Sequence, residues 1–264
     1  MNIIQAIILG IVQGLTEFLP ISSSGHLTLF QKLFGLEEGA VTFGVAVHFA
    51  TLVAVVAVLW KDVLEMIKKP FGKLSLLVVV GTIPTLVIAL IFKDTFEYLA
   101  ETGASLGIEF IFTGIILWYA ESLNNNKKKD KTLNDTNYKD AVVVGIAQGF
   151  AILPAISRSG TTLAGALFRG LNREFALRFS FLMSIPAILA GTLVEGVDLV
   201  RGTNAGVDLI TLLAGMLAAG VSGYLAIRFM LKVFTKASLK MFSYYVFVIG
   251  ALVLVDQLFT HRFF

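Results

Sequence analysis

The chain contains one polar motif twice, as GIVQGLTEFLPISSSGH at residues 10–26 and as GIAQGFAILPAISRSGT at residues 145–161. Both copies contain G-I-x-Q-G, then a Leu-Pro pair, then S-x-S-G. Proline and the Ser-Gly pair interrupt helices, so each copy is predicted to be a helix, a break and a second helix. The copies differ in ionisable residues, because the first carries Glu17 and His26 and the second carries Arg158. The chain therefore repeats one set of polar and helix-breaking residues, but the two copies carry different ionisable side chains.

The composition around these motifs is that of a membrane protein. Of 264 residues, 56% are hydrophobic and only 15% are charged, and the mean hydropathy is +0.84. Soluble domains have about 45–50% apolar and about 25% charged residues, and a single core could not bury the excess found here. The chain has no cysteine, which excludes disulfides, thiolate metal sites and a cysteine nucleophile.

Six segments are apolar enough to cross a bilayer as helices, which takes about 20 residues for about 30 Å of hydrocarbon. They are residues 41–60, 74–92, 106–121, 175–195, 207–228 and 241–260, of which 106–121 is short. A backbone in lipid finds hydrogen-bond partners only within its own helix, so all six are expected to be helical.

The loops between these spans alternate in charge. Residues 61–73, 124–139 and 228–240 are rich in lysine and arginine, whereas 93–105 and 196–206 each contain one basic residue. By the positive-inside rule the three basic loops are predicted to be cytoplasmic and the other two external. The net charge of +3 is explained mostly by these topology-setting loops.

The motif regions, residues 1–36 and 140–174, are too interrupted to be spans and are predicted to be re-entrant hairpins that enter from opposite faces. Each half then has one hairpin and three spans, and an odd number of spans inverts the second half relative to the first. The predicted fold is an all-α polytopic membrane protein with an inverted-topology repeat, six transmembrane helices and two re-entrant helical hairpins. The repeats are residues 1–121 and 140–264, joined by a basic cytoplasmic linker at 122–139.

The break in the first hairpin offers a carboxylate, an imidazole and hydroxyl groups. Gln13 and Glu17 lie four residues apart and share one helix face. An ionisable residue at membrane depth is costly and indicates function by default, so Glu17 and His26 are candidate catalytic residues. The hydroxyl groups belong to Ser22, Ser23 and Ser24, which could also serve only as partners for the backbone.

The break in the second hairpin resembles a site for an oxyanion. Arg158 has a planar fork that suits phosphate oxygens, and Gly160 lets a ligand approach the backbone at the start of the return helix, where anions are favoured. The alternative is that Arg158 only neutralises Glu17 as a buried ion pair, which is compatible with function. The predicted substrate-binding groups at the two breaks are those of Arg158, Ser157, Ser159, Gly160, Thr161, Thr162, Ser22 and Ser24.

A cation for phosphate, a carboxylate, an imidazole and hydroxyls together predict phosphoryl transfer at the meeting point of the two breaks. His48 and Glu109 also lie inside predicted spans, and a structural role is expected for each. Arg169, Arg173 and Arg178 are expected near the cytoplasmic surface, where they set topology or contact lipid headgroups.

The motifs QGLTEFLPISSSGH and PAISRSGTT resemble those of the undecaprenyl-pyrophosphate phosphatases, also called bacitracin-resistance proteins, and the resemblance covers essentially the whole chain. The first is similar to the (E/Q)xxxE motif of that family followed by its Ser-Ser-x-Gly-His segment. The second is similar to its P-G-x-S-R-S-G-x-T motif. Gln13 stands where many members have Glu, and Ala155 replaces the glycine of the second motif.

The resemblance implies hydrolysis of a C55 polyprenyl pyrophosphate to the monophosphate and inorganic phosphate, which recycles the lipid carrier of peptidoglycan synthesis. It implies a divalent cation, Mg²⁺ or Ca²⁺, with Gln13 and Glu17 in metal and substrate binding. It implies catalytic roles for Ser23, His26 and Arg158. The nucleophile is left open between His26, Ser23 and a water that His26 activates.

The resemblance also places the protein in the bacterial cytoplasmic membrane, with its site open toward the outer face. The expected partners are the polyprenyl pyrophosphate and membrane lipids, with no nucleic acid, and a homodimer is allowed. A different class of function is an alternating-access carrier or flippase for a polyprenyl phosphate or another anion, because inverted repeats with hairpins are common in transporters. A structural scaffold would explain neither break.

Overall fold

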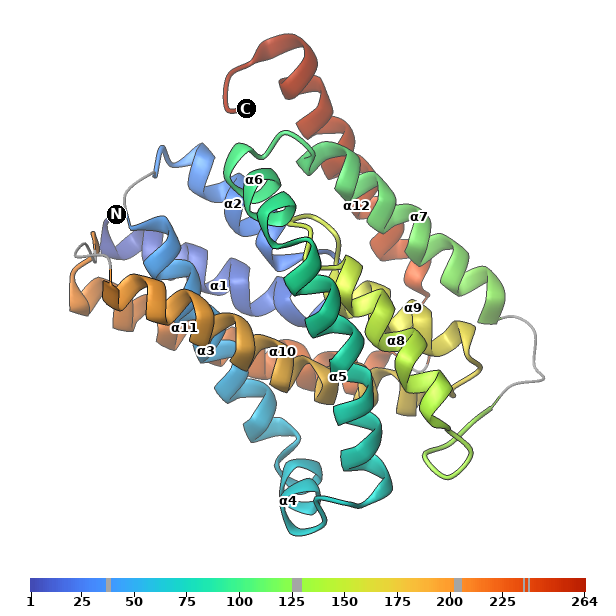
Figure 1. Cartoon of the computed structure of the whole chain (residues 1–264). Coiled ribbons are helices and arrows are strands. Elements are labelled where there is room, and N and C mark those ends of the chain that lie inside the picture. The colour runs from blue at the N-terminus through green and yellow to red at the C-terminus, as the bar shows by residue number, and fades with distance from the viewer. Residues whose placement is uncertain (37–38, 125–129, 202–205, 235, 237) are drawn as a thin grey trace.

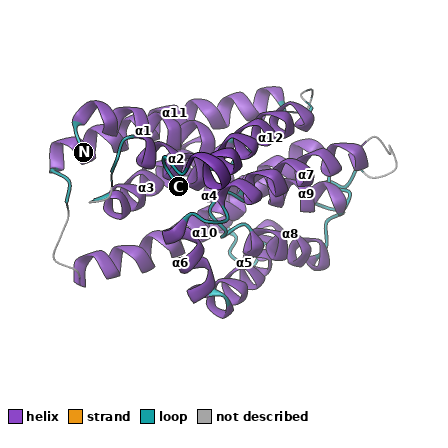
Figure 2. Ribbon diagram, turned by 90° about the horizontal axis from the view of Figure 1, so that it is seen from above, coloured by secondary structure: helices purple, strands orange, loops and turns teal. Residues whose placement is uncertain are grey.

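The computed structural model describes residues 1–36, 39–124, 130–201, 206–234, 236 and 238–264. All the regular elements in these residues are helices, apart from one isolated β-bridge between Lys131 and Leu171 (Figure 2). The helices are α1 Ile3–Phe18, α2 Ser23–Leu33, α3 Ala40–Val58, α4 Trp60–Lys68, α5 Lys73–Ile91, α6 Lys93–Thr102, α7 Leu106–Asn124, α8 Tyr138–Phe150, α9 Arg158–Phe168, α10 Arg173–Arg201, α11 Leu209–Val233 and α12 Leu239–Val255. A π-helical turn, Asp256–Thr260, continues α12.

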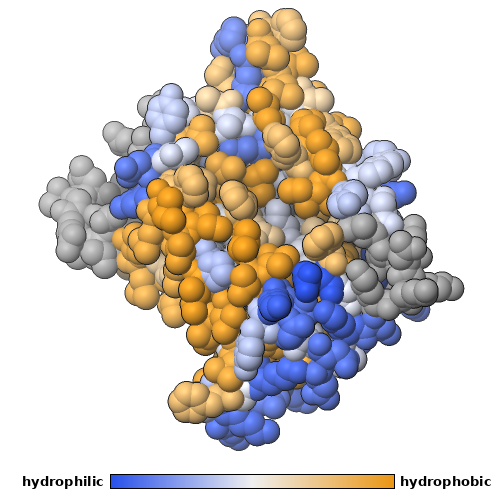
Figure 3. All heavy atoms as spheres, turned by 45° about the vertical axis from the view of Figure 1, so that its right-hand side comes forward, coloured by the Kyte–Doolittle hydropathy of each residue, from blue (hydrophilic) through white to orange (hydrophobic). Residues whose placement is uncertain are grey.

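Five of these helices are long and apolar enough to cross a membrane: α3, α5, α10 over Arg173–Val194, α11, and α12 extended to Thr260. Their outward faces carry large apolar side chains, and Figure 3 shows hydrophobic residues over most of one face, with hydrophilic residues gathered toward one end. Such a surface needs lipid as its solvent. The prediction of an all-α, multi-pass membrane protein is therefore confirmed.

The sixth predicted span, residues 106–121, is helical as part of α7 and packs along α12 (Figure 1). Its crossing of the membrane stays a prediction. Two predicted connecting loops contain short helices: α4 begins at Trp60, the last residue of the predicted span 41–60, and continues into the loop 61–73, and α6 lies within 93–105. Both regions were predicted as loops because they are charged and, with nine and ten residues, these helices are too short to cross a bilayer.

The two motif regions form hairpins of short helices, as expected. α1 has 16 residues and α8 has 13, which at 1.5 Å per residue gives about 24 Å and about 20 Å, less than a bilayer core. α1 ends before Leu19-Pro20, and α8 ends before the stretch that contains Leu153-Pro154. The return helices, α2 and α9, begin at Ser23 and Arg158, after serine N-caps.

The first helix of each hairpin begins with the same capping arrangement. Asn2 caps α1 and Asn137 caps α8, and each closes a capping box with the residue three positions on, Gln5 or Asp140. The motif repeat therefore extends back to the first residues of both hairpins. Only the second box contains a charge.

Each hairpin packs against a helix from the other half of the chain. α1 lies along α11, and α8 lies along α5 (Figure 1). A Cβ atom at Gly10 would lie 2.3 Å from the carbonyl oxygen of Gly215, and one at Gly145 would lie 1.9 Å from that of Gly81. Both contacts therefore need glycine, because the two backbones touch there. These interfaces place the breaks of both hairpins in the middle of the bundle.

Candidate active site

The two breaks meet and hydrogen-bond each other. The hydroxyl of Ser22 in the first break donates to the carbonyl of Pro154 in the second at 2.7 Å. The hydroxyl of Ser159 donates to the carbonyl of Leu19 at 2.9 Å in the opposite direction. The predicted meeting of the motifs is therefore present, and it fixes the loops that carry the ionisable side chains.

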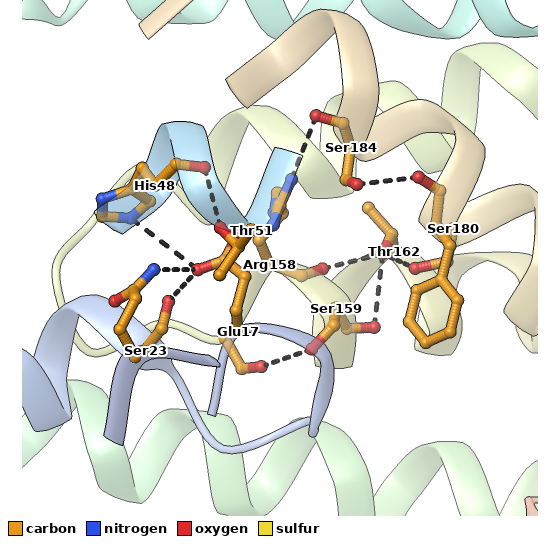
Figure 4. A network of polar contacts seen from close by, with 12 residues as sticks. Glu17, Ser23, His48, Thr51, Arg158, Ser159, Thr162, Ser180 and Ser184 are labelled. Atoms are coloured by element: carbon orange, nitrogen blue, oxygen red, sulfur yellow. Dashed lines mark hydrogen bonds and ion pairs between the residues drawn. The ribbon is translucent and has the colours of Figure 1, made fainter. Parts of the chain in front are cut away.

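Glu17 is the centre of the polar network between the breaks (Figure 4). One carboxylate oxygen pairs with the Arg158 guanidinium. The other oxygen accepts hydrogen bonds from Nε2 of Gln13 at 2.8 Å and from the Ser23 hydroxyl, and it lies 3.7 Å from Nε2 of His48. Glu17 is only 5% exposed. Four predicted site residues are thus brought together, and the ion pair of the alternative interpretation is made.

The second break forms the N-terminus of α9. Ser157 is the N-cap and accepts a hydrogen bond from the N–H of Gly160 at 3.1 Å. The hydroxyls of Thr161 and Thr162 donate to the carbonyls of Ser157 and Arg158 at 2.9 and 2.7 Å. Of the predicted phosphate-binding groups, these two threonines are therefore bonded to their own helix in this structure.

His26 and Ser24 lie apart from the Glu17 network. Nδ1 of His26 is 2.6 Å from the Ser22 carbonyl and Nε2 is 2.8 Å from the Tyr245 hydroxyl, while the edge of Phe110 meets its ring. The imidazole is only 2% exposed. Within the described residues His26 makes no polar contact with Glu17, and the side chain of Ser24 is exposed.

Comparison with known proteins identifies the family of this chain. Residues 6–252 match the family model described as bacitracin resistance protein BacA. The chain belongs to this family. A protein of Carboxydothermus hydrogenoformans named undecaprenyl-diphosphatase is 53% identical over 259 residues, 97% of this chain and 98% of the relative. A Bacillus cereus protein named undecaprenyl-diphosphatase 4 is 46% identical over 257 residues, with the same coverage.

Two polar residues of this BacA-family chain, His48 and Glu109, were expected to be structural, and only one of them is separate from the Glu17 network. His48 reaches the Glu17 carboxylate from α3, so it belongs to the network. Glu109 accepts hydrogen bonds from the Ser105 hydroxyl at 2.5 Å and from the Ala155 N–H at 2.7 Å. It holds the second break, in agreement with the structural interpretation, and its contact with Ala155 is at the position where the family motif has glycine.

Sequence reasoning missed Tyr245 and Thr113. Tyr245 contacts His26 across 219 positions of sequence, and no local pattern marks it among the aromatic residues of α12. Thr113 donates to the Ala155 carbonyl at 2.8 Å and accepts from the Ser157 N–H at 3.0 Å. Thr113 could have been found from the sequence, because its hydroxyl lies one helical turn after Glu109 on the same face of α7.

The three arginines expected at the cytoplasmic surface each have an acidic partner that the sequence did not reveal. The pairs are Arg169 with Asp140 at 2.8 Å, Arg173 with Glu121 at 2.6 Å, and Arg178 with Asp62. The acids lie on helices α8, α7 and α4, so these pairs tie separate parts of the bundle together.

Asp140 is fully buried and has the most complete set of partners. Burial acts to raise the pKa of its carboxyl group, but the Asn137 N–H together with the cations of Lys131 and Arg169 outweighs burial and holds the pKa below its usual range. The carboxylate in the capping box of α8 therefore also holds the preceding loop through its ion pair with Lys131.

The oxygen atoms beside Glu17 are the donors available to a metal ion. Oε1 of Gln13 is buried and has no hydrogen-bond partner among the described residues. An acceptor of this kind normally finds a partner, so an orphaned one beside a carboxylate fits a hard cation. No group of three His, Cys, Asp or Glu residues in the described part of the chain could hold a metal. The donor set thus suits an ion that keeps several waters.

Proposed function

We propose that this protein hydrolyses undecaprenyl pyrophosphate to undecaprenyl phosphate and inorganic phosphate and so recycles the lipid carrier of cell-wall synthesis. One observation carries the proposal: Arg158 and Glu17 meet beside Ser23 between the two hairpin breaks. An arginine fork, a carboxylate and a hydroxyl in one buried site are the groups that phosphoryl transfer needs. The relatives reported above are named for diphosphatase activity, which favours the hydrolase over the carrier.

Substrate binding would exchange one anion for another at Arg158. In this structure the guanidinium pairs with Glu17, and its NH1 lies 3.3 Å from the Ser184 carbonyl. A pyrophosphate that takes the guanidinium satisfies its charge and releases Glu17 from it. The same step therefore binds the substrate and frees a base.

The geometry favours Ser23 as the nucleophile and Glu17 as its base. The Ser23 hydroxyl already donates to the Glu17 carboxylate, whereas both nitrogens of His26 are occupied by protein groups. The Ser23 oxygen would bond to the terminal phosphorus while the anhydride P–O bond breaks, and its proton would pass to Glu17. Water would then release phosphate from Ser23, and undecaprenyl phosphate would leave as the other product.

A divalent cation, Mg²⁺ or Ca²⁺, would be held by Oε1 of Gln13 and the Glu17 carboxylate. It would neutralise charge on the two phosphates. The orphaned amide oxygen of Gln13 supports this position. Arg158 and the hydroxyls of the breaks would orient the remaining phosphate oxygens.

The architecture we propose is two inverted repeats, residues 1–121 and 140–264, in the bacterial cytoplasmic membrane. The α1–α11 and α8–α5 interfaces are matched contacts of the kind that such a repeat produces. Six spans, basic loops inside and a site that opens toward the outer face complete this arrangement, and lipids and a second copy of the chain are its expected neighbours. Single cysteines at Lys69 and Asp94, which are both exposed, should be labelled from opposite sides of the membrane.

Phosphate release by the detergent-purified protein tests the function directly. Undecaprenyl pyrophosphate and the short analogue farnesyl pyrophosphate should both release phosphate with Mg²⁺, and release should stop with a chelator. Ser23→Ala is the matched inactive variant, because it removes the hydroxyl and keeps the backbone. No release by the wild-type protein with Mg²⁺ or Ca²⁺ would reject the hydrolase and favour the carrier.

A further inference from the structure

His26 has one tautomer imposed on it by its surroundings. Nδ1 is 2.6 Å from the carbonyl oxygen of Ser22, and a carbonyl can only accept, so Nδ1 carries the proton. The neutral imidazole then has a bare Nε2. Ser22 itself has φ 68°, a left-handed value that is uncommon for serine. The His26 bond therefore also holds the backbone conformation that turns the first break toward Ser23.

Tyr245 of α12 completes the enclosure of the imidazole. Its hydroxyl lies 2.8 Å from Nε2, and because Nε2 is bare, the phenol is the donor. The two rings are stacked, with 7° between their planes and 5.6 Å between their centroids. The ring of Phe110 is nearly perpendicular to the imidazole, with 5.3 Å between the two ring centroids. Nδ1 is thus fixed by the neighbouring Ser22, whereas Nε2 and the ring are held by Tyr245 and Phe110 from distant segments.

We propose that Tyr245 is a positioning residue that acts through His26. The Ser22 carbonyl fixes the tautomer, and the phenol donates to the bare Nε2 and so holds the ring in the orientation in which Nδ1–H bonds Ser22. This bond sets the break that presents Ser23 to Glu17. The kinetic part of this inference rests on the proposed function, whereas the hydrogen bond itself does not.

Tyr245→Phe tests the inference because it keeps the stacked ring and removes only the hydroxyl. Tyr244→Phe is the matched control, since Tyr244 is exposed and packs edge-on against Trp118 at 5.3 Å. The chain has three histidines, so ¹⁵N-histidine spectra of the protein in lipid can be assigned with a His26→Asn variant. Tyr245→Phe should shift the Nε2 signal of His26 away from the hydrogen-bonded position, and Tyr244→Phe should not.

The kinetics should separate positioning from substrate binding. Losing a single hydrogen bond of about 0.5–1.5 kcal/mol predicts that kcat for phosphate release from farnesyl pyrophosphate falls about two- to tenfold in Tyr245→Phe. KM should stay within about twofold, because no contact to phosphate is removed. Tyr244→Phe should leave both constants unchanged.

Three outcomes would overturn the inference in distinguishable ways. Unchanged His26 signals in Tyr245→Phe would show that the hydrogen bond is not made. A normal kcat in Tyr245→Phe, together with an inactive His26→Asn, would remove Tyr245 from the reaction and leave the proposed function intact. Full activity of His26→Asn would show that His26 has no role in the reaction, so Tyr245 could have no catalytic effect through it.

Discussion

The two hairpin breaks are built on one framework and carry opposite chemistry. Both follow a G-I-x-Q-G helix and a Leu-Pro pair, both cap the return helix with serine, and each donates a serine hydroxyl to the other. The first presents the carboxylate of Glu17 and the second presents the guanidinium of Arg158. The shared serines Ser22 and Ser159 maintain the meeting of the breaks. The unshared Glu17, Ser23 and Arg158 give the candidate site its charges and its hydroxyl.

This difference explains how repeated motifs can build an asymmetric candidate site. Two identical breaks would bring two carboxylates or two arginines together, and like charges at this depth repel. With opposite charges the free protein is satisfied by an internal ion pair, which we propose the anionic substrate replaces. The following predictions test this comparison, from the largest expected effect to the smallest.

The charge of the second break should not be replaceable by a point charge. Arg158→Lys keeps the positive charge but loses the planar fork, so kcat should fall ~10²–10³-fold, as for the loss of one charge-stabilising donor. Phosphate release at saturating farnesyl pyrophosphate is the measurement. Turnover close to wild type would mean that only the sign of the charge matters.

The charge of the first break should affect kcat and metal dependence together. Glu17→Gln keeps the shape and removes the base, so kcat should fall ~10²-fold and half-activation should need more Mg²⁺. KM should not rise, because Arg158 loses its internal competitor. Gln13→Glu should be active, with equal or tighter metal dependence. Wild-type turnover and metal dependence in Glu17→Gln would make Glu17 a structural acid.

The glycine contacts of both hairpins should be intolerant of a side chain. Gly145→Ala and Gly10→Ala place a Cβ against a backbone carbonyl, so each should lower stability by about 1–3 kcal/mol. The effect should be larger at Gly145, where the approach is closer. Gly191→Ala is the control, because in the described part of the chain a Cβ there would meet no atom of another segment within 4 Å, and it should be neutral or stabilising by up to about 1 kcal/mol. Thermal unfolding in detergent measures all three.

The two capping boxes should differ in pH dependence. The folded-state pKa of Asp140 is lowered, so its charge stabilises the fold above the unfolded pKa of about 4, and this contribution is lost as the pH falls through the folded pKa. Asp140→Asn should cost about 1–3 kcal/mol at pH 7, less than for a pair in which both partners are buried, because Lys131 and Arg169 are partly exposed. The difference from wild type should shrink toward pH 3.

Gln5→Ala provides the comparison from the uncharged box of α1. Its effect on thermal stability should be the same at pH 7 and pH 3, because neither partner of that box titrates. A pH-independent effect of Asp140→Asn would mean that the carboxylate acts only as a hydrogen-bond acceptor.

The serine bonds between the breaks should have the smallest effects. Ser159→Ala removes one partly buried hydrogen bond and should cost about 1 kcal/mol. Ser22→Ala removes a similar bond and also the N-cap of α2, so it should cost about 1–2 kcal/mol. Unfolding midpoints in detergent give the ranking, and a larger cost for Ser159→Ala would contradict it.

The sequence by itself determined the solvent of this protein and the outline of its fold. Long apolar segments leave the backbone no partner except its own helix, so five predicted spans are present as helices of sufficient length. The proline and serine breaks were readable because they interrupt helices through local geometry. Glu17 and His26 stood out because an ionisable group is costly at membrane depth, and Arg158 because its planar fork beside a helix N-terminus suits phosphate oxygens.

Only the tertiary structure decided which polar groups share one site. Glu17 and Arg158 are 141 positions apart, and their direct pairing depends on how the hairpins pack through Gly10 and Gly145. The same packing brings His48 to the carboxylate and encloses His26 with Tyr245, neither of which has a local signal. The residue type shows that burying a charge is costly. The partner that offsets this cost comes from a distant segment, so it is known only from the packing of the helices.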